Sequence, residues 1–257
     1  MAVLKVNNLS KSFGGIEALK DINLEIHENE IIGLIGQNGA GKTTFFNLLT
    51  GIYAPTSGEI EYNLGKRITS RDLKPHKTAG YGISRTFQNI RLFQNMTVME
   101  NVLLGYHTGF KYGLASSLFK LPSRHKDEYE HYERSLNLLK EFKLLDKKDV
   151  LARNLSYGEQ RRLEIARALA ANPKVLLLDE PAAGMNPNET KELTSLIRWI
   201  RETFDLTIIL IEHDMSLVMK VCERIFVFDS GRLIAEGTPD EISRNQRVIK
   251  AYLGEEA

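Results

Sequence analysis

The stretch that decides the fold is "EIIGLIGQNGAGKTTFFNLLTG", residues 30–51. Its apolar run, 31–35, is typical of a strand that is buried on both faces of a parallel sheet. The glycine-rich segment "GQNGAGKTT", 36–44, follows directly and leads into a helix over 43–51. This order of strand, loop and helix is a P-loop in the context that the motif requires. The stretch therefore predicts an α/β fold that binds a nucleotide.

The P-loop residues explain how a phosphate chain would be held. Glycines allow backbone N–H groups to converge on the phosphates, and the helix N-terminus adds a partial positive charge. Lys42 is expected to reach the β and γ phosphates, and the Thr43 hydroxyl is expected to ligate Mg²⁺. An incidental glycine-rich turn is the alternative, which the complete motif disfavours. The predicted binding residues of this loop are Gly36, Asn38, Gly39, Ala40, Gly41, Lys42, Thr43 and Thr44.

Two adjacent acids end a second apolar run, "VLLLDEP", residues 175–181. Asp179 is suited to the magnesium shell, and Glu180 is suited to take a proton from water. Two acids at this position are also compatible with an ordinary solvated strand end. The presence of a P-loop in the same chain favours the catalytic interpretation.

Further patterns divide the chain into a core and an insertion. "TIILIEHD" (207–214) and "RIFVFDSG" (224–231) predict more buried parallel strands, whereas residues 1–30 alternate as in an antiparallel β lobe. Strand signals vanish from residue 97 to residue 149, where Thr97 and Glu100 form a capping box. We expect one domain, 1–257, in which 1–87 and 155–257 form the core with its β lobe and 88–154 form an inserted helical subdomain. One helical face of that insertion is expected to be its own core: Tyr129, Tyr132, Leu136, Leu139 and Phe142.

The composition of the chain limits which partners it can bind and where in the cell it can work. The chain has 34 basic and 33 acidic residues and a pI near 7.8, so it lacks the positive field of a nucleic-acid-binding protein. Its single cysteine, Cys222, excludes an internal disulfide. The N-terminus has no apolar run that would suit a signal peptide, which predicts a cytoplasmic protein. The apolar runs are too short to cross a bilayer, so membrane work would require other chains.

A second helix start also suits an anion, in "NLSYGEQRRLEIARALA", residues 154–170. Ser156 is placed to cap this helix, and Gly158 allows close approach to its first turn. Because the P-loop already provides one complete phosphate cradle, the second turn raises the question of which phosphate it would hold.

The order of these motifs along nearly the whole chain resembles the ATP-binding subunits of ABC transporters, which have a RecA-like P-loop NTPase core. The resemblance rests on Gly36 to Thr44, Gln88, "LSYGEQ" (155–160), "LLLDEP" (176–181) and His213. It implies that Phe13 stacks on adenine, that Gln88 links Mg²⁺ and the lytic water to a membrane partner, and that His213 contacts the γ phosphate. Taken singly, each of these three residues is also compatible with a structural role. The lack of an "NKxD"-type segment favours ATP over GTP.

Longer segments narrow the resemblance to the larger ATPase subunit of branched-chain amino-acid importers. They include "SRTFQNIRLFQNMTVMENVL" (84–103), "DEPAAGMNP" (179–187) and "VIKAYLGEE" (248–256). The implied partners are a homologous ATPase subunit, hydrophobic permease subunits and, indirectly, a solute-binding protein. This places the chain at the inner face of the cell membrane. Importers of urea or short amides and the ATPase of lipopolysaccharide export carry similar segments and remain alternatives. Two other classes fit the sequence less well: a soluble ABC protein that acts on DNA or ribosomes, and a P-loop kinase of small molecules.

Three residues depart from the broad family pattern. Tyr157 and Glu159 stand where "LSGGQ" has glycine and glutamine, and Asn186 stands where aspartate is usual. Ser156 and Glu159 also form the spacing of a capping box, so plain helix capping is compatible with phosphate binding. The resemblance implies that Ser156, Gly158 and Glu159 face the ATP of a partner subunit, with two subunits stacked head to tail.

Overall fold

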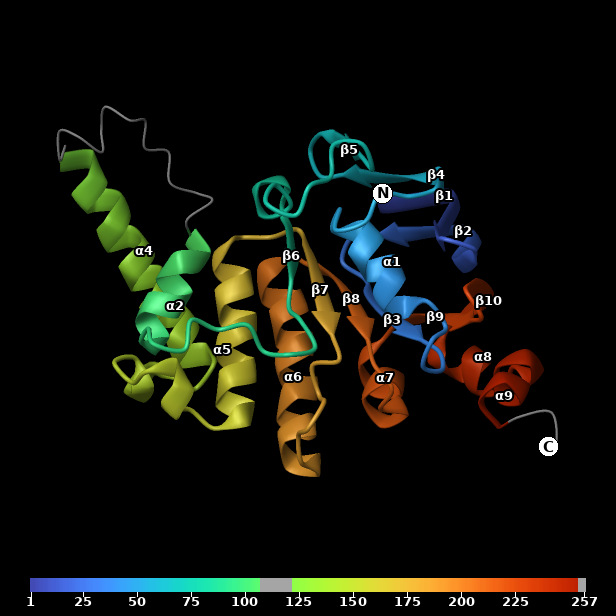
Figure 1. Cartoon of the computed structure of the whole chain (residues 1–257). Coiled ribbons are helices and arrows are strands. Elements are labelled where there is room, and N and C mark those ends of the chain that lie inside the picture. The colour runs from blue at the N-terminus through green and yellow to red at the C-terminus, as the bar shows by residue number, and fades with distance from the viewer. Residues whose placement is uncertain (107–121, 254–257) are drawn as a thin grey trace. The chain divides into compact units, whose positions relative to one another are not determined.

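The computed structural model describes residues 1–106 and 122–253, which form two compact units (Figure 1). We call residues 1–88 and 174–257 the α/β unit and residues 89–173 the helical unit. The predicted insertion, 88–154, ends earlier than this helical unit. The difference concerns one helix, which is described below.

An antiparallel sheet of four strands forms the β lobe of the α/β unit, in the order β2-β1-β4-β5. Its strands are β1 (Ala2–Phe13), β2 (Ile16–His27), β4 (Ser57–Asn63) and β5 (Arg67–Thr69). Opposite residues such as Val6 and Leu24 pair across β1 and β2, and both are buried. Alternation buries one face of such a sheet, which explains the apolar and polar periodicity of these strands. The predicted antiparallel lobe is confirmed.

A second sheet of six strands has the order β10-β9-β3-β8-β7-β6. Its strands are β3 (Ile31–Ile35), β6 (Ile83–Arg85), β7 (Val175–Asp179), β8 (Thr207–Ile211), β9 (Arg224–Asp229) and β10 (Arg232–Gly237). Neighbours are parallel except β9 and β10, which pair antiparallel. The four predicted apolar strands are β3, β7, β8 and β9, and the α/β fold class is confirmed. The edge strands β6 and β10 complete the sheet.

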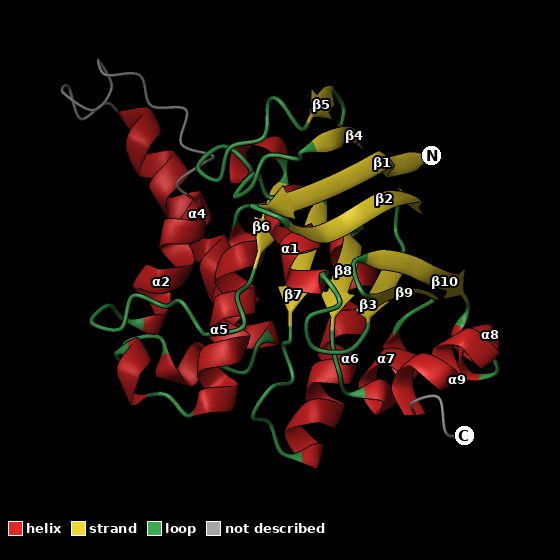
Figure 2. Ribbon diagram, turned by 45° about the vertical axis from the view of Figure 1, so that its right-hand side comes forward, coloured by secondary structure: helices red, strands yellow, loops and turns green. Residues whose placement is uncertain are grey.

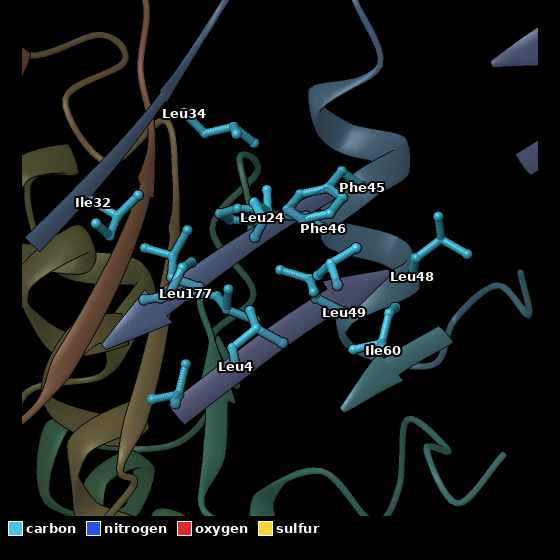
Figure 3. Close-up of a cluster of buried hydrophobic side chains, with 14 of the residues drawn as sticks. Leu4, Leu24, Ile32, Leu34, Phe45, Phe46, Leu48, Leu49, Ile60 and Leu177 are labelled. Carbon is cyan, nitrogen blue, oxygen red and sulfur yellow. The ribbon is translucent and has the colours of Figure 1, made fainter. Parts of the chain in front are cut away.

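The helix after the P-loop joins the two sheets into one core. Phe45 and Phe46 of α1 (Lys42–Leu49) are fully buried among residues of both sheets, including Leu4 of β1 and Ile32 of β3 (Figure 3). Figure 2 shows α1 between the strands of the lobe and those of the parallel sheet. This packing fixes the start of α1, and with it the P-loop, at the carboxyl end of β3.

The other helices of the α/β unit follow the parallel strands or the β9–β10 hairpin. They are α6 (Pro187–Phe204), α7 (Met215–Val221), α8 (Pro239–Ser243) and α9 (Gln246–Leu253), with a 3₁₀ turn, η1, at Ala79–Tyr81. Over the described residues, 1–106 and 122–253, no helix combines the length and the apolar character that crossing a bilayer requires.

The helical unit contains α2 (Val98–Gly105), α4 (Pro122–Glu141), η3 (Leu145–Lys147), η4 (Ala152–Asn154) and α5 (Tyr157–Ala170). Thr97 and Glu100 form the predicted capping box of α2. Helix α5, which the sequence division assigns to the core, packs against α2 and α4. The approach is so close that a Cβ on Gly105 would lie 2.3 Å from the carbonyl oxygen of Arg167. This packing explains why the compact helical unit extends to residue 173.

The predicted core face of 129–142 is only partly buried. Leu139 and Phe142 are buried and Tyr132 and Leu136 are half-buried, but Tyr129 is 67% exposed. The expectation for Tyr129 is therefore wrong. Ten residues of helix separate Tyr129 from Leu139 by about 15 Å, so only the later turns of this face are covered.

Candidate nucleotide site

The P-loop glycines stand where any side chain would collide or strain the backbone. Gly36 has φ +154°, and a Cβ there would lie 2.2 Å from the carbonyl oxygen of Phe228 in β9. Gly41 has φ +102°, and a Cβ there would lie 2.7 Å from Leu19 in β2. Gly39 has φ +85° but open space around it. The loop is thus held between two strands while its middle faces solvent.

Gly36→Ala should therefore damage both the fold and the site. Because the new methyl group would meet a backbone carbonyl, β9 or the loop must move, and we expect the free energy of unfolding to fall by about 1–3 kcal/mol. ATP affinity should fall about tenfold or more, which is about 1.4 kcal/mol. Thermal unfolding and nucleotide titration measure the two effects. Gly80→Ala is the control, since a Cβ there meets nothing within 4 Å. Unchanged ATP affinity in Gly36→Ala would contradict the assignment of this loop.

The start of α1 carries no side-chain cap. Gly41 occupies the N-cap position and makes no side-chain hydrogen bond to the helix. A helix start without a cap leaves N–H groups for an anion. Of the predicted residues, Asn38, Gly39 and Thr43 are exposed, whereas Thr44 is half-buried and Ala40 is buried.

The Lys42 ammonium is held inside the loop. Its Nζ donates to the carbonyl oxygens of Gly36 at 2.7 Å and Gln37 at 2.9 Å. Burial lowers the pKa of Lys42, while the charges of Glu180 and Asp179 work in the opposite direction. The lysine is therefore held by the loop within range of the charges of Asp179 and Glu180.

Asp179 and Glu180 have different surroundings. Asp179 is buried, and its Oδ2 accepts from Nη2 of Arg85 at 2.7 Å. Glu180 has φ +46°, a strained conformation for a residue with a side chain, while its N–H donates to the carbonyl oxygen of Ile211. The regular strand ends at Asp179, and the two neighbouring acids contact different partners.

Glu180 meets two other predicted residues. Its Oε2 accepts from Nε2 of Gln88 at 2.9 Å and lies 3.9 Å from Nδ1 of His213. The His213 side chain is 66% exposed. The ends of β6, β7 and β8 thus bring together residues that are far apart in the sequence.

Glu212 is a site residue that sequence reasoning missed. It is buried next to His213, and its carboxylate accepts from the N–H groups of Ala182 at 2.7 Å and of His213 at 3.2 Å. Burial raises the pKa of Glu212, although these hydrogen bonds oppose the shift. Glu212 thereby ties the loop after Glu180 to the backbone of His213. The signal was present as the acid of "IEHD", directly before the histidine.

Phe13 lies at the end of β1 and is 41% exposed. Its ring contacts Tyr53 edge-on, with centroids 5.0 Å apart and planes at 75°. Nζ of Lys11 lies 4.9 Å from the centre of the Phe13 ring. Sequence reasoning identified Phe13 but missed both neighbours, because neither belongs to a recognisable motif.

In the helical unit, Ser156 caps α5 as predicted. The Glu159 N–H donates to Ser156 Oγ at 3.4 Å, and the Ser156 N–H donates to Glu159 Oε2 at 3.0 Å. Glu159 also pairs with Lys147. Burial works to raise the pKa of Glu159, but the hydrogen bonds from Lys147 and Ser156 outweigh burial and hold that pKa below its ordinary value. Ser156 and Tyr157 are exposed, while Gly158 is buried.

Asn186, the third departure, caps α6. Its Oδ1 accepts from the N–H groups of Asn188 at 2.9 Å and Glu189 at 3.0 Å. Asn and Asp are about equally good caps. The local structure of this loop therefore does not require the charge that aspartate would carry.

Comparisons with known proteins agree with this geometry. The family model described as ABC transporter matches residues 19–183, and the one described as branched-chain amino acid ATP-binding cassette transporter matches residues 232–257. The chain is 49% identical over 253 residues to the high-affinity branched-chain amino acid transport ATP-binding protein LivG of Escherichia coli K12, covering 98% of each chain.

Solved structures are also similar over almost the whole chain. The ADP conformation of MJ1267, an ATP-binding cassette of an ABC transporter, is 30% identical, with a TM-score of 0.82 and coverage of 99% of this chain and 100% of that one. The dimeric post-hydrolysis state of the cassette MJ0796 with ADP and Pi is 27% identical, with a TM-score of 0.75 and coverage of 92% and 98%. With its P-loop, its paired strand-end acids and these whole-chain similarities, the chain belongs to the family of ABC transporter ATP-binding cassettes, which are ATPases.

Proposed function

We propose that this chain is the ATP-hydrolysing, energy-coupling subunit of an importer of branched-chain amino acids. The observation that carries the proposal is the contact of Glu180 with Gln88 and its proximity to His213, beside a complete P-loop. The solute class is supported by the similarity to LivG over 98% of each chain and by the family match at 232–257. The whole chain, 1–257, would work as one ATPase domain.

Each site residue then has a role in binding or hydrolysis. Gly36 to Thr44 would cradle the phosphates, and Lys42 would exchange its loop carbonyls for the β and γ phosphates. Glu180 would take a proton from the attacking water, since its carboxylate lies beside Gln88 and His213 at the ends of β6, β7 and β8. His213 would contact the γ phosphate, and Phe13 with Tyr53 would pack against adenine.

The residues present fit Mg²⁺ as a cofactor. Thr43, Asp179 and Gln88 offer a hydroxyl, a carboxylate and an amide oxygen, all of the hard type that Mg²⁺ binds. Within the described part of the chain, no cluster of three or more His, Cys, Asp or Glu side chains could hold a metal. Mg²⁺ usually keeps several waters and substrate phosphates as ligands, so the hydroxyl, the carboxylate and the amide oxygen would be only part of its shell. When bound, the ion would neutralise charge on the transferred phosphoryl group.

We further propose a shared site between two ATPase subunits. Ser156, Gly158 and Glu159 would contact the phosphates bound by a partner through the Ser156 hydroxyl and backbone N–H groups, and the partner's equivalent turn would complete this chain's site. The exposure of Ser156 at the start of α5 supports this role. The capping box is compatible with it, since an anion can replace the capping oxygen at the same N–H groups. The dimeric state of MJ0796 shows that a related cassette pairs. Hydrophobic permease subunits and, through them, a solute-binding protein would be the other partners, at the inner face of the membrane.

Uptake of labelled leucine tests the solute class. Cells that lack this gene should lose most high-affinity leucine uptake and regain it with the wild-type gene but not with Glu180→Gln. Unlabelled isoleucine and valine should compete, whereas urea and short amides should not. Competition by urea or an amide alone, with leucine uptake unaffected by the deletion, would instead favour the related importers. A deletion that changes only lipopolysaccharide export would favour the exporter.

A further inference from the structure

Arg85 is an arginine with an almost fully covered side chain that none of the proposed roles uses. It is the last residue of β6, and its side chain is 7% exposed; the side chain of its partner Asp179, at the end of β7, is 6% exposed. The two residues are 94 positions apart in the sequence, yet Nη2 of Arg85 lies 2.7 Å from Oδ2 of Asp179. A charge-assisted contact of this length restricts the orientation of the carboxylate. One oxygen of Asp179 is thus engaged by the arginine, and the orientation of the other is set by that contact.

The other side of the Arg85 guanidinium is anchored on α1. Nη1 donates to Oδ1 of Asn47 at 2.7 Å and to Oγ1 of Thr50 at 3.3 Å. Asn47 lies four residues after Thr43, so both side chains share one face of α1. Arg85 therefore joins the acid that ends β7 to the helix face that carries the Thr43 hydroxyl.

Two aromatic rings restrict the guanidinium further. Its centre lies 5.4 Å from the ring of Phe46 in α1 and 5.1 Å from the ring of Phe87. An arginine head is well suited to stack on such rings while its planar fork donates on both sides. Gln88 directly follows Phe87, so the same segment carries the third proposed magnesium ligand.

We propose that Arg85 is a positioning residue for the magnesium site. It holds the Asp179 carboxylate at a set angle to the Thr43 face of α1, so that the ligands on two elements are arranged before the ion arrives. The inference rests on the proposed magnesium role of Thr43, Asp179 and Gln88. Groups that orient metal ligands typically matter 10–100-fold for metal affinity or activity. Arg85 should thus act on magnesium dependence more than on nucleotide binding itself.

The test separates magnesium from nucleotide affinity and needs no turnover. Binding of a fluorescent ATP analogue is titrated with Mg²⁺ at fixed nucleotide, and nucleotide binding is measured again with the metal removed by EDTA. For Arg85→Met, the half-saturating Mg²⁺ concentration should rise about tenfold or more. Its nucleotide affinity in EDTA should change less than about twofold, within the spread expected for a site that loses no phosphate contact. Arg85→Lys keeps the charge but loses the fork, so it should lie between Arg85→Met and wild type.

Two controls make the outcome decisive. Arg67→Met removes an exposed arginine that pairs with Glu61, and it should leave the Mg²⁺ titration unchanged. If Arg85→Met does not fold, Asn47→Ala removes one anchor of the guanidinium while Asp179 stays paired, and a smaller shift in the same direction is expected. An unchanged Mg²⁺ titration in the folded variant, or equal losses with and without the metal, would overturn the role of Arg85. A wild-type chain without Mg²⁺-dependent binding would instead refute the proposed magnesium role of Thr43, Asp179 and Gln88, on which the inference rests.

Discussion

Glu180→Gln should bind MgATP with the affinity of the wild type and hydrolyse it about a hundredfold more slowly or worse. Glutamine keeps the size of the side chain and its contact with Gln88 but removes the proton acceptor. Loss of turnover with unchanged substrate binding is the signature of an interaction made in the transition state. Phosphate release at saturating MgATP measures turnover, and binding of a fluorescent ATP analogue measures affinity.

Glu202→Gln is the matched control, because Glu202 is an exposed acid on α6 outside the site. It should hydrolyse ATP as the wild type does. Near-normal turnover in Glu180→Gln would remove Glu180 from the role of base. A parallel loss of MgATP binding would show that Glu180 maintains the binding site rather than the proton transfer. Glu212 is a poor substitute for the base, since its carboxylate is already committed to two backbone N–H groups.

The fold could be predicted to the extent that strands carried continuous apolar runs. Strands β3, β7 and β8 are buried along their whole length, and each was visible as such a run. Strand β6 was not visible, because its three residues, Ile83–Arg85, end in a charge. Only its neighbour β7, with which it pairs in parallel, defines it as a strand. Short edge strands depend on tertiary pairing more than on local pattern.

The candidate site likewise contains residues that the sequence predicts and residues that it does not. Residues within compact motifs, such as Lys42 and Glu180, could be named from spacing alone. Arg85 could not, because its partners Asp179 and Asn47 lie 94 and 38 positions away. Contacts of this kind leave no periodic trace in one sequence. The aromatic contact between Phe13 and Tyr53 was invisible for the same reason.

The boundary of the helical unit shows another limit of sequence patterns. Helix α5 follows the insertion and precedes β7, so the pattern allows either unit to contain it. In the structure α5 packs against α2 and α4, and Gly105 permits α2 to approach the backbone of α5 at Arg167. A lone glycine near the end of a predicted helix is more often interpreted as a stop signal than as a packing contact.

Tyr157 has a structural explanation that its departure from "LSGGQ" did not suggest. Its hydroxyl accepts from Nη2 of the buried Arg161 at 3.3 Å, one turn along α5. Tyr157 remains 44% exposed and directly follows the Ser156 cap. The larger side chain is thus accommodated by a contact within α5, next to the Ser156 cap.

A mixture of two inactive variants should recover nucleotide trapping if the site is shared between subunits. Lys42→Ala removes the ammonium that would hold the β and γ phosphates, and Ser156→Arg places a long side chain at the start of α5. Each variant alone should fail to trap nucleotide with a phosphate-mimicking anion, because every site in its dimer carries the lesion. A mixed dimer concentrates both lesions in one site and leaves the other with intact Lys42 and intact Ser156.

Trapping distinguishes the two arrangements more sharply than turnover does, since steady hydrolysis can require both sites of a dimer. If Lys42 and Ser156 of one chain served the same nucleotide, every site in the mixture would still hold one lesion, and mixing would restore nothing. With random pairing of equal amounts, about half of the dimers are mixed, each with one competent site, so trapping should reach about a quarter of the wild-type level. Dimers must be confirmed by their mass in solution, and the experiment should be repeated with a homologous ATPase subunit if this chain prefers that partner. Confirmed mixed dimers that trap no more than the separate variants, in either pairing, would refute the shared site and leave the cap of α5 as a purely structural feature.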